Sequence, residues 1–226
     1  MPRPPVAKDT IPMHVVIRPP NYQVAVHTIA GDVPLVLNNF SEEAKRHMQG
    51  NMELGSKSKQ TKAKKEPRDF EAEYKGSMHV STEGWYGIPC SAFRSALIRA
   101  CSTCGVVMTQ AKMCIFIEAD GFEEVTGKPL VKITKGKPAK FIDYVRNSNG
   151  SPDLRARARW APGWEIKLRV KYDADLYSLS TVTNLLTRAG VSVGICAGRP
   201  FSSNSAGQGW GTFTILRNPV QLVPSR

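Results

Sequence analysis

The sequence predicts an α+β fold built as one domain. Segments in which apolar residues recur every second position flank two segments in which they recur at helical spacing. A chain of 226 residues can bury a full core without disulfides or metal, and this length suits one domain with insertions better than two equal domains. We therefore expect a single compact unit over residues 1–226.

The first half of the chain predicts two strands and one helix. A short strand is expected at His14–Ile17, and a longer one at Tyr22–Ile29 shows a clear two-residue period. The helix that follows has Pro89 in its first turn, where the missing N–H costs nothing, and Gly105 just beyond its end. Its apolar positions are Phe93, Ala96, Leu97, Ala100, Cys101 and Cys104.

The second half predicts further strands and a second helix. Strands are expected at 113–117, 130–134 and 140–145, and a β-hairpin over 155–172 turns at Ala161-Pro162-Gly163. A helix with Ser178 or Ser180 as its N-cap ends at Gly190, and a last strand covers 210–216. The apolar positions of this helix are Leu179, Val182, Leu185, Leu186 and Ala189.

This order of elements is the βαββαβ plan of a ferredoxin-like or RNA-recognition-type core with inserted strands. The segment 41–69 carries eight Lys or Arg, five acids and few large apolar residues, so we expect a mobile basic insertion there. A second insertion of strands and loops is expected at 119–163, and a glycine-rich loop at 190–211.

The charge of the chain predicts a polyanionic partner. There are 31 Lys and Arg against 19 Asp and Glu, which leaves a formal net charge of +12. A basic enzyme or a merely soluble surface are the alternatives that charge alone leaves open.

Two basic groups are candidates for RNA contact. The lysines of the insertion could order along a nucleic-acid strand, although a solvated loop has the same composition; they are Lys57, Lys59, Lys62, Lys64 and Lys65. In the expected hairpin, alternation places Arg155, Arg157 and Arg159 on one face and apolar residues on the other. The alternative is an ordinary solvent-facing side of a sheet.

The glycine-rich segment runs from Gly190 to Gly211. Glycine lets the backbone approach a ligand and expose its N–H groups, which suits contact with phosphates. The segment matches neither the triphosphate-binding loop nor the dinucleotide fingerprint. This argues against an enzyme that binds a nucleoside triphosphate and against one that binds a dinucleotide. A flexible connection before the last strand is the alternative.

Two motifs resemble one known family. The segment Gly194-Ile-Cys-Ala-Gly198-Arg199 followed by Gly207-Gln-Gly-Trp-Gly211 is similar to the C-terminal glycine-rich loop of RAMP-superfamily proteins, the RNA-binding subunits of CRISPR effector complexes. The segment from Ile88 to Leu97 resembles the signature that opens the first helix of that family, with Cys90 where the family often has Gly. The stretch from Phe201 to Ala206 is longer than the family pattern.

The resemblance implies a non-catalytic backbone subunit that assembles with further copies of itself and with other effector subunits along a guide RNA, and that meets target nucleic acid. It implies RNA contacts for Arg94 on the first helix and for Gly198, Arg199 and Gly207 in the loop. Arg99, on the same helix, is a further candidate for RNA contact. No cofactor is expected.

Two other functions remain open from the residues. Some RAMP relatives cleave RNA with an aspartate after the first strand, so Asp32 makes a metal-dependent ribonuclease the enzymatic alternative. A phage or host assembly protein with a basic surface is the structural one. No metal site is expected, because Cys101 and Cys104 lack a second pair and are predicted to face the core. The absence of an apolar span and five unpaired cysteines predict a cytoplasmic protein without membrane contact.

Overall fold

The computed structural model describes residues 18–39, 49, 52–53, 68–146, 150–202, 207–216 and 221–224, and confirms a mixed α+β fold. The expected strand at 14–17 and the five lysines of the basic insertion lie outside the described residues. Within the described part of the chain, no helix is long and apolar enough to cross a membrane.

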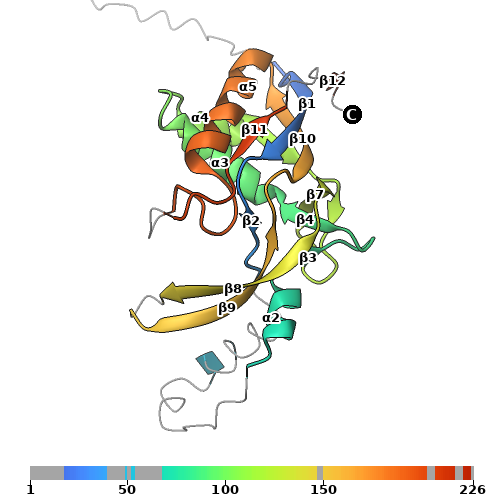
Figure 1. Ribbon diagram of the computed structural model, residues 1–226. Helices are drawn as coiled ribbons and strands as arrows, with labels where there is room; N and C mark the ends of the chain where they lie inside the picture. The colour runs from blue at the N-terminus through green and yellow to red at the C-terminus, as the bar shows by residue number, and fades with distance from the viewer. Residues whose placement is uncertain are drawn as a thin grey trace, which may run out of the picture.

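The main layer is an antiparallel sheet of nine described strands (Figure 1). Its central strand β1 pairs along nearly its whole length with β10, and β10 shares its other edge between β5 and β7. The order is β11-β1-β10-β7-β4-β3, with β12 beside β1 and β6 beside β7. The strands are β1 Tyr22–Gly31, β3 His79–Val80, β4 Tyr86–Pro89, β5 Ile115–Glu118, β6 Gly121–Phe122, β7 Pro129–Lys135, β10 Glu165–Asp173, β11 Phe213–Ile215 and β12 Gln221–Pro224.

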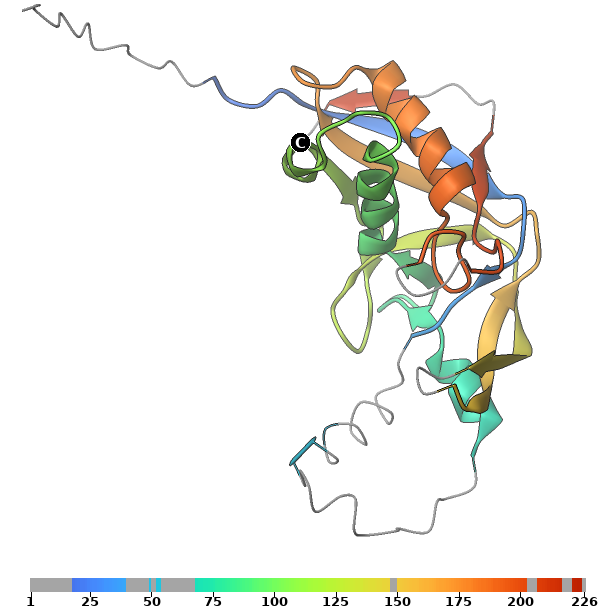
Figure 2. The ribbon, with the colours of Figure 1, turned by 90° about the vertical axis from the view of Figure 1, so that its left-hand side faces the viewer.

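Two helices cover one face of this sheet (Figure 2). They are α3 (Cys90–Cys101) and α5 (Leu179–Arg188), and α5 continues into a π-helical turn, η2 (Ala189–Val193). Both helices were expected, and Ser178 is the N-cap of α5, accepting the N–H of Thr181. The sequence did not predict α2 (Phe70–Gly76) or α4 (Met108–Cys114), because each is only seven residues long.

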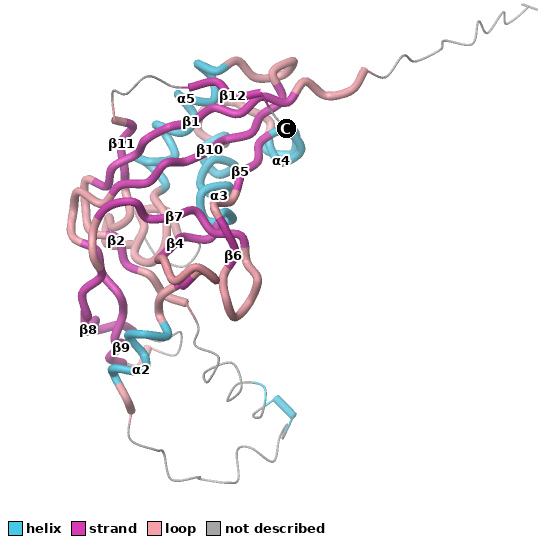
Figure 3. The backbone as a smooth tube through the Cα atoms, turned by 90° about the vertical axis from the view of Figure 1, so that its right-hand side faces the viewer, coloured by secondary structure: helices cyan, strands magenta, loops and turns pink. Residues whose placement is uncertain are grey.

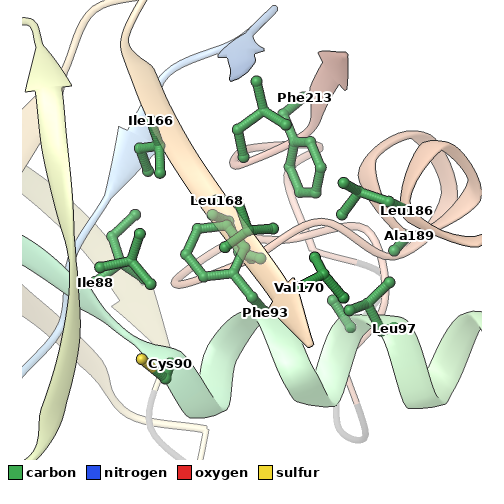
Figure 4. Packing of buried hydrophobic residues seen from close by; sticks show 14 of the residues in the cluster. Ile88, Cys90, Phe93, Leu97, Ile166, Leu168, Val170, Leu186, Ala189 and Phe213 are labelled. Carbon is green, nitrogen blue, oxygen red and sulfur yellow. The ribbon is translucent and has the colours of Figure 1, made fainter. Parts of the chain in front are cut away.

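The core lies between the helices and the inner face of the sheet (Figure 4). On β10, Ile166, Leu168 and Val170 are fully buried, and Leu97 and Leu186 reach them from α3 and α5. The ring of Phe93 meets that of Phe213 edge-on, with centroids 6.2 Å apart. The spacing of apolar residues in the sequence therefore identified both the helix faces and the strand faces that pack together in the core.

A second, three-stranded sheet projects from the main one (Figure 1). It comprises β2 (Leu35–Val36), β9 (Pro152–Trp160) and β8 (Pro138–Arg146), in that order. The expected hairpin over 155–172 is wrong, because β9 pairs with β8 and β10 pairs with β1. The turn at Pro162 and Gly163 is a crossing between two sheets. Of the strands in the expected insertion 119–163, β6 and β7 belong to the main sheet and β8 and β9 to the small one.

The crossings between the sheets meet at Trp164, whose side chain is fully buried. Gly31 donates its N–H to the Trp164 carbonyl at 2.9 Å, and Gly163 donates to the Gly31 carbonyl at 2.8 Å. A Cβ on Gly31 would lie 1.9 Å from the indole of Trp164, so only glycine fits there. The indole N–H donates to the carbonyl of Val33 at 3.0 Å. The two chain crossings are thus held against each other.

His27 is a polar residue in the apolar core, opposite Leu168 on the neighbouring strand. It is 1% exposed, and neither ring nitrogen has a hydrogen-bond partner among the described residues. Burial lowers the pKa of His27 below its ordinary value of 6.5.

We expect His27 to make stability depend on pH. The unfolded chain takes up a proton near pH 6.5 and the folded chain only at lower pH, so stability falls as the pH drops below about 6.5. Replacing His27 with Leu should flatten the dependence between pH 7.5 and pH 5.5 in urea unfolding. An equal loss of stability in both proteins would contradict this assignment.

Candidate nucleic-acid interface

The glycine-rich segment has two arms, residues 194–198 and 207–211, which are joined by hydrogen bonds between their backbones. Ile195 donates its N–H to the Gly211 carbonyl at 3.0 Å, and Gln208 and Trp210 both donate to the Gly198 carbonyl, at 2.8 and 3.0 Å. The described glycines from 194 to 211 all have positive φ, and so does Cys196 at 63°. The described part of this segment therefore has a conformation that is held by its own backbone hydrogen bonds.

The glycines are required by the close approach of the two arms. A Cβ on Gly207 would lie 1.9 Å from the Arg199 carbonyl oxygen, and one on Gly211 would lie 2.0 Å from that of Ile195. A Cβ on Gly198 would lie 2.5 Å from the ring of Trp210. The amides of Gly198 and Arg199, in contrast, donate to no acceptor within the described part of the chain.

The loop binds the edge of β2 that does not pair with β9. Ala197 donates to the Val36 carbonyl at 3.0 Å and Gly211 to the Pro34 carbonyl at 2.9 Å. Val36 is the register partner of Arg159 on β9. The backbone of the loop is thereby held beside the arginine-bearing strand.

Two aromatic rings join the loop to the small sheet. The rings of Trp210 and Phe141 meet edge-on with centroids 5.7 Å apart, and the Arg159 guanidinium lies 4.9 Å from the centre of the Phe141 ring. We call these three residues the Arg159 cluster. Because a guanidinium over a ring keeps its edge donors available, Arg159 can still bind a phosphate.

On its other side the loop contacts α3 through Phe201. The Arg99 guanidinium lies 3.9 Å from the centre of the Phe201 ring. Figure 2 shows the loop below the ends of α3 and α5, on the helix-covered side of the molecule. The loop therefore bridges Arg99 and the Arg159 cluster.

A groove of about 370 Å³ continues from Arg99 along α3 towards α4. Its side chains combine three cations with apolar and hydroxyl groups and include no carboxylate. They are Ser91, Arg94, Ser95, Ile98, Arg99, Met108 and Lys112. Together with Arg159 and Arg199, these cations give the helix-covered side an electropositive strip.

Arg94 has a structural task within this strip. Its Nε donates to the Ile115 carbonyl at 3.0 Å, its Nη2 donates to the Lys112 carbonyl, and its guanidinium lies 5.1 Å from the Phe116 ring centre. Arg94 thus ties α4 and the start of β5 to α3, and an additional RNA contact remains a prediction.

The three arginines of β9 have different surroundings. Arg157 is 8% exposed, and its Nη1 lies 3.0 Å from Oδ2 of Asp143. Burial lowers the pKa of Arg157, against the opposing effect of Asp143. Arg155 pairs with Asp153 at 3.2 Å. The face on which alternation places these arginines is therefore not uniformly basic, because acidic side chains pair with two of them.

Arg199 turns its guanidinium back onto its own loop. Its Nη1 donates to the Cys196 carbonyl at 3.0 Å. The Cys196 thiol is enclosed although the residue is half-buried, and burial raises its pKa to about 12, so the thiol is neutral at physiological pH. Arg199 is half-buried and has no ion pair within the described part of the chain.

Asp32 is exposed at the end of β1, where its Oδ1 accepts the hydroxyl of Thr214 at 3.2 Å. Nowhere in the described ranges do three or more His, Cys, Asp or Glu side chains gather as metal ligands. Cys101 is buried as expected, but Cys104 is exposed, because α3 ends at Cys101 and the chain leaves the helix before Cys104.

The one close histidine–carboxylate pair among the described residues is structural. His79 Nδ1 lies 2.6 Å from Glu123 Oε1, and the same oxygen accepts the side-chain amide of Asn39 at 3.0 Å. Burial favours a raised pKa for Glu123, but hydrogen bonds from Thr126 and His79 outweigh it and lower the pKa. This enclosed network joins the end of β2 to the main sheet.

Neither models of known protein families nor curated proteins match this sequence. Function is therefore inferred from the residues of the chain itself. The sequence pointed to Arg99 and Arg199, but it did not identify Phe141, Phe201 and Trp210 as their aromatic neighbours. The sequence marked only Trp210 as a residue that could pack closely in the loop, because a tryptophan between two glycines has room to lie against the backbone.

Gly207 and Gly209 form a matched pair for testing the loop. Both have positive φ, but a Cβ would clash only at Gly207, whereas nothing lies within 4 Å of one at Gly209. We expect Gly207→Ala to speed amide hydrogen exchange at Gln208 and Trp210 by more than tenfold, a loss of more than about 1.4 kcal/mol. Gly209→Ala should have a clearly smaller effect. Equal effects would show that close backbone contact does not hold the loop.

We expect the loss of the Arg157 side chain to destabilise the folded protein. Truncating Arg157 to Ala leaves the carboxylate of Asp143 buried without its partner, at an expected cost of about 3–5 kcal/mol in the free energy of unfolding. Arg159→Ala, on the same strand face, should cost less than about 1 kcal/mol. Urea unfolding of both variants measures the difference, and similar losses would count against a structural role confined to Arg157.

Proposed function

We propose that this protein is a non-catalytic RNA-binding subunit of the RAMP type, which assembles along a guide RNA in a CRISPR-type effector complex. The observation that carries the proposal is the position of the glycine-rich loop between Arg99 on α3 and the Arg159 cluster. Cations and aromatic rings interleave there around a closely packed backbone, and this combination suits single-stranded RNA.

The order of the core strands supports the proposal. Strands β11, β1, β10 and β5 lie side by side and antiparallel, with α3 between β1 and β5 in the chain and α5 between β10 and β11. This order supports a ferredoxin-like βαββαβ core, in which the other strands would be insertions. The motifs that resemble the RAMP family then open the first core helix and precede the last core strand.

Exposed apolar residues on the small sheet support assembly with further copies or with other effector subunits. Tyr144 and Leu154 are register partners across β8 and β9, and Ile142 lies on the same face. They are 57%, 47% and 50% exposed, respectively. A projecting sheet that offers such a face to solvent is suited to contact another protein.

The helix-side cations should bind RNA through its phosphates. If about six phosphates are neutralised, the logarithm of the association constant should fall with the logarithm of salt concentration at a slope of about −4. We expect Arg159→Ala and Arg199→Ala each to weaken binding of labelled single-stranded RNA about tenfold and to reduce the slope by about 0.7, alike for different sequences. Fluorescence anisotropy at several salt concentrations measures both quantities.

Lys75→Ala is the matched control, because Lys75 is exposed on α2, away from the loop. Binding that does not depend on salt, or that all three variants reduce equally, would contradict the proposal. Cleavage of the RNA in Mg²⁺ that Asp32→Ala abolishes would favour the ribonuclease instead. Assembly of nucleic-acid-free protein, without RNA binding, would favour a structural assembly protein.

A further inference from the structure

The main sheet has a second face, opposite to α3 and α5. Figure 3 looks onto this strand side, whereas Figure 2 looks onto the helices. Along β10, Lys167, Arg169 and Lys171 alternate with the buried core residues, so their side chains project from this second face. Thr28 and Val26 on β1 are the register partners of Lys167 and Arg169. We call this surface the strand-side face.

Aromatic and cationic side chains meet at one end of the strand-side face. Phe116 of β5 is the register partner of Lys171, and its ring meets the ring of Tyr22 edge-on at 6.0 Å between centroids. The Lys171 ammonium lies 4.9 Å from the centre of the Tyr22 ring. Both residues are half-buried, and the guanidinium of Arg94 on α3 lies 5.1 Å from the centre of the Phe116 ring.

Trp85 provides a third ring on the same face. It lies against two glycines, since a Cβ on Gly87 or Gly121 would be 2.9 or 2.8 Å from its ring. The Lys132 ammonium is 5.6 Å from the ring centre. A hollow of about 230 Å³ opens beside the indole, where Thr134, Lys167 and Arg169 also line it.

Asp120, Glu118 and Glu83 on this face have partners within the described part of the chain. Arg169 pairs with Asp120 at 2.6 Å and with Glu118 at 3.6 Å. Glu83 accepts the indole N–H of Trp85 at 3.1 Å, which fixes the orientation of the ring. In the described part of the chain, Lys132, Lys167 and Lys171 make no ion pair with a carboxylate. These three lysines are therefore available to a polyanion.

We propose that the strand-side face is a second, separate binding surface for single-stranded nucleic acid. Unpaired bases stack on Trp85 and on the Tyr22–Phe116 pair, and Lys132, Lys167 and Lys171 contact the phosphates between them. Stacking on rings accepts any base, so binding is expected with little sequence preference. This surface does not depend on the glycine-rich loop, and the two inferences can fail separately.

The test uses the full chain with three helix-side cations removed by Arg99→Ala, Arg159→Ala and Arg199→Ala, while Arg94 and Lys112 stay in place. Labelled oligouridylate is the probe, and double-stranded RNA of the same length is the comparison. Adding Lys167→Gln and Lys171→Gln should weaken the remaining binding about tenfold and reduce the salt slope by about 1.4, for two phosphates at 0.7 each. Adding Lys75→Gln and Lys140→Gln, the same change in charge on α2 and β8, should leave binding unchanged.

Trp85→Ala should weaken binding by between about 5-fold and 150-fold, and Trp85→Phe by much less, because a phenyl ring can still stack. Thermal unfolding of each variant separates loss of binding from loss of fold, and the lysine pair decides the case if Trp85→Ala unfolds. Ultraviolet crosslinking of the oligouridylate should label the peptides that contain Tyr22, Trp85 or Phe116.

Absence of residual binding, an unchanged affinity in the lysine variant, or equal affinity for double-stranded RNA would each overturn the strand-side proposal, even if the intact protein binds RNA. Association of copies through this face without nucleic acid would overturn it as well. Binding that depends on Lys167 and Lys171 but not on the helix-side arginines would uphold it, and would refute the proposed role of the glycine-rich loop.

Discussion

The contact between Gly31 and Trp164 is the constraint on which the arrangement of the two sheets depends. The chain leaves the main sheet after β1 and returns to it before β10, and both crossings pass the same point. The hydrogen bonds of Gly31 and Gly163 join the two crossings, and the buried indole fills the space that a side chain on Gly31 would need. The direction of the small sheet, and with it the position of Arg159 beside the loop, follows from this contact.

Arginines of similar sequence context have different roles because their surroundings differ. Arg157 is buried and paired with Asp143, and Arg94 is bound to two backbone carbonyls, so both hold the fold together. Arg99 and Arg159 instead lie over aromatic rings, where the guanidinium keeps donors for a ligand. Within the described part of the chain, some arginines therefore hold the fold together and are not available to a polyanion.

The glycines of the loop serve mainly to bring backbone against backbone. Gly207 and Gly211 lie where a Cβ would strike a carbonyl of the opposite arm, and the Gly211 amide is bound to β2. A loop built in this way presents a preformed surface, which reduces the entropy lost when a ligand binds. The amides of Gly198 and Arg199 are among those that donate to no acceptor in the described part of the chain.

The sequence by itself determined the α+β class, the positions of α3, α5, β1, β7, β8 and β10, and the glycine-rich segment, because these depend on local periodicity and on residues that start or end helices. The tertiary structure alone decided which strands pair: β9 and β10 have the alternation of a hairpin, yet they belong to different sheets. It also decided that Asp143 neutralises Arg157, and that Phe201 and Trp210 of the loop contact Arg99 and Phe141, respectively. These are contacts between residues far apart in the chain, and no local pattern specifies them.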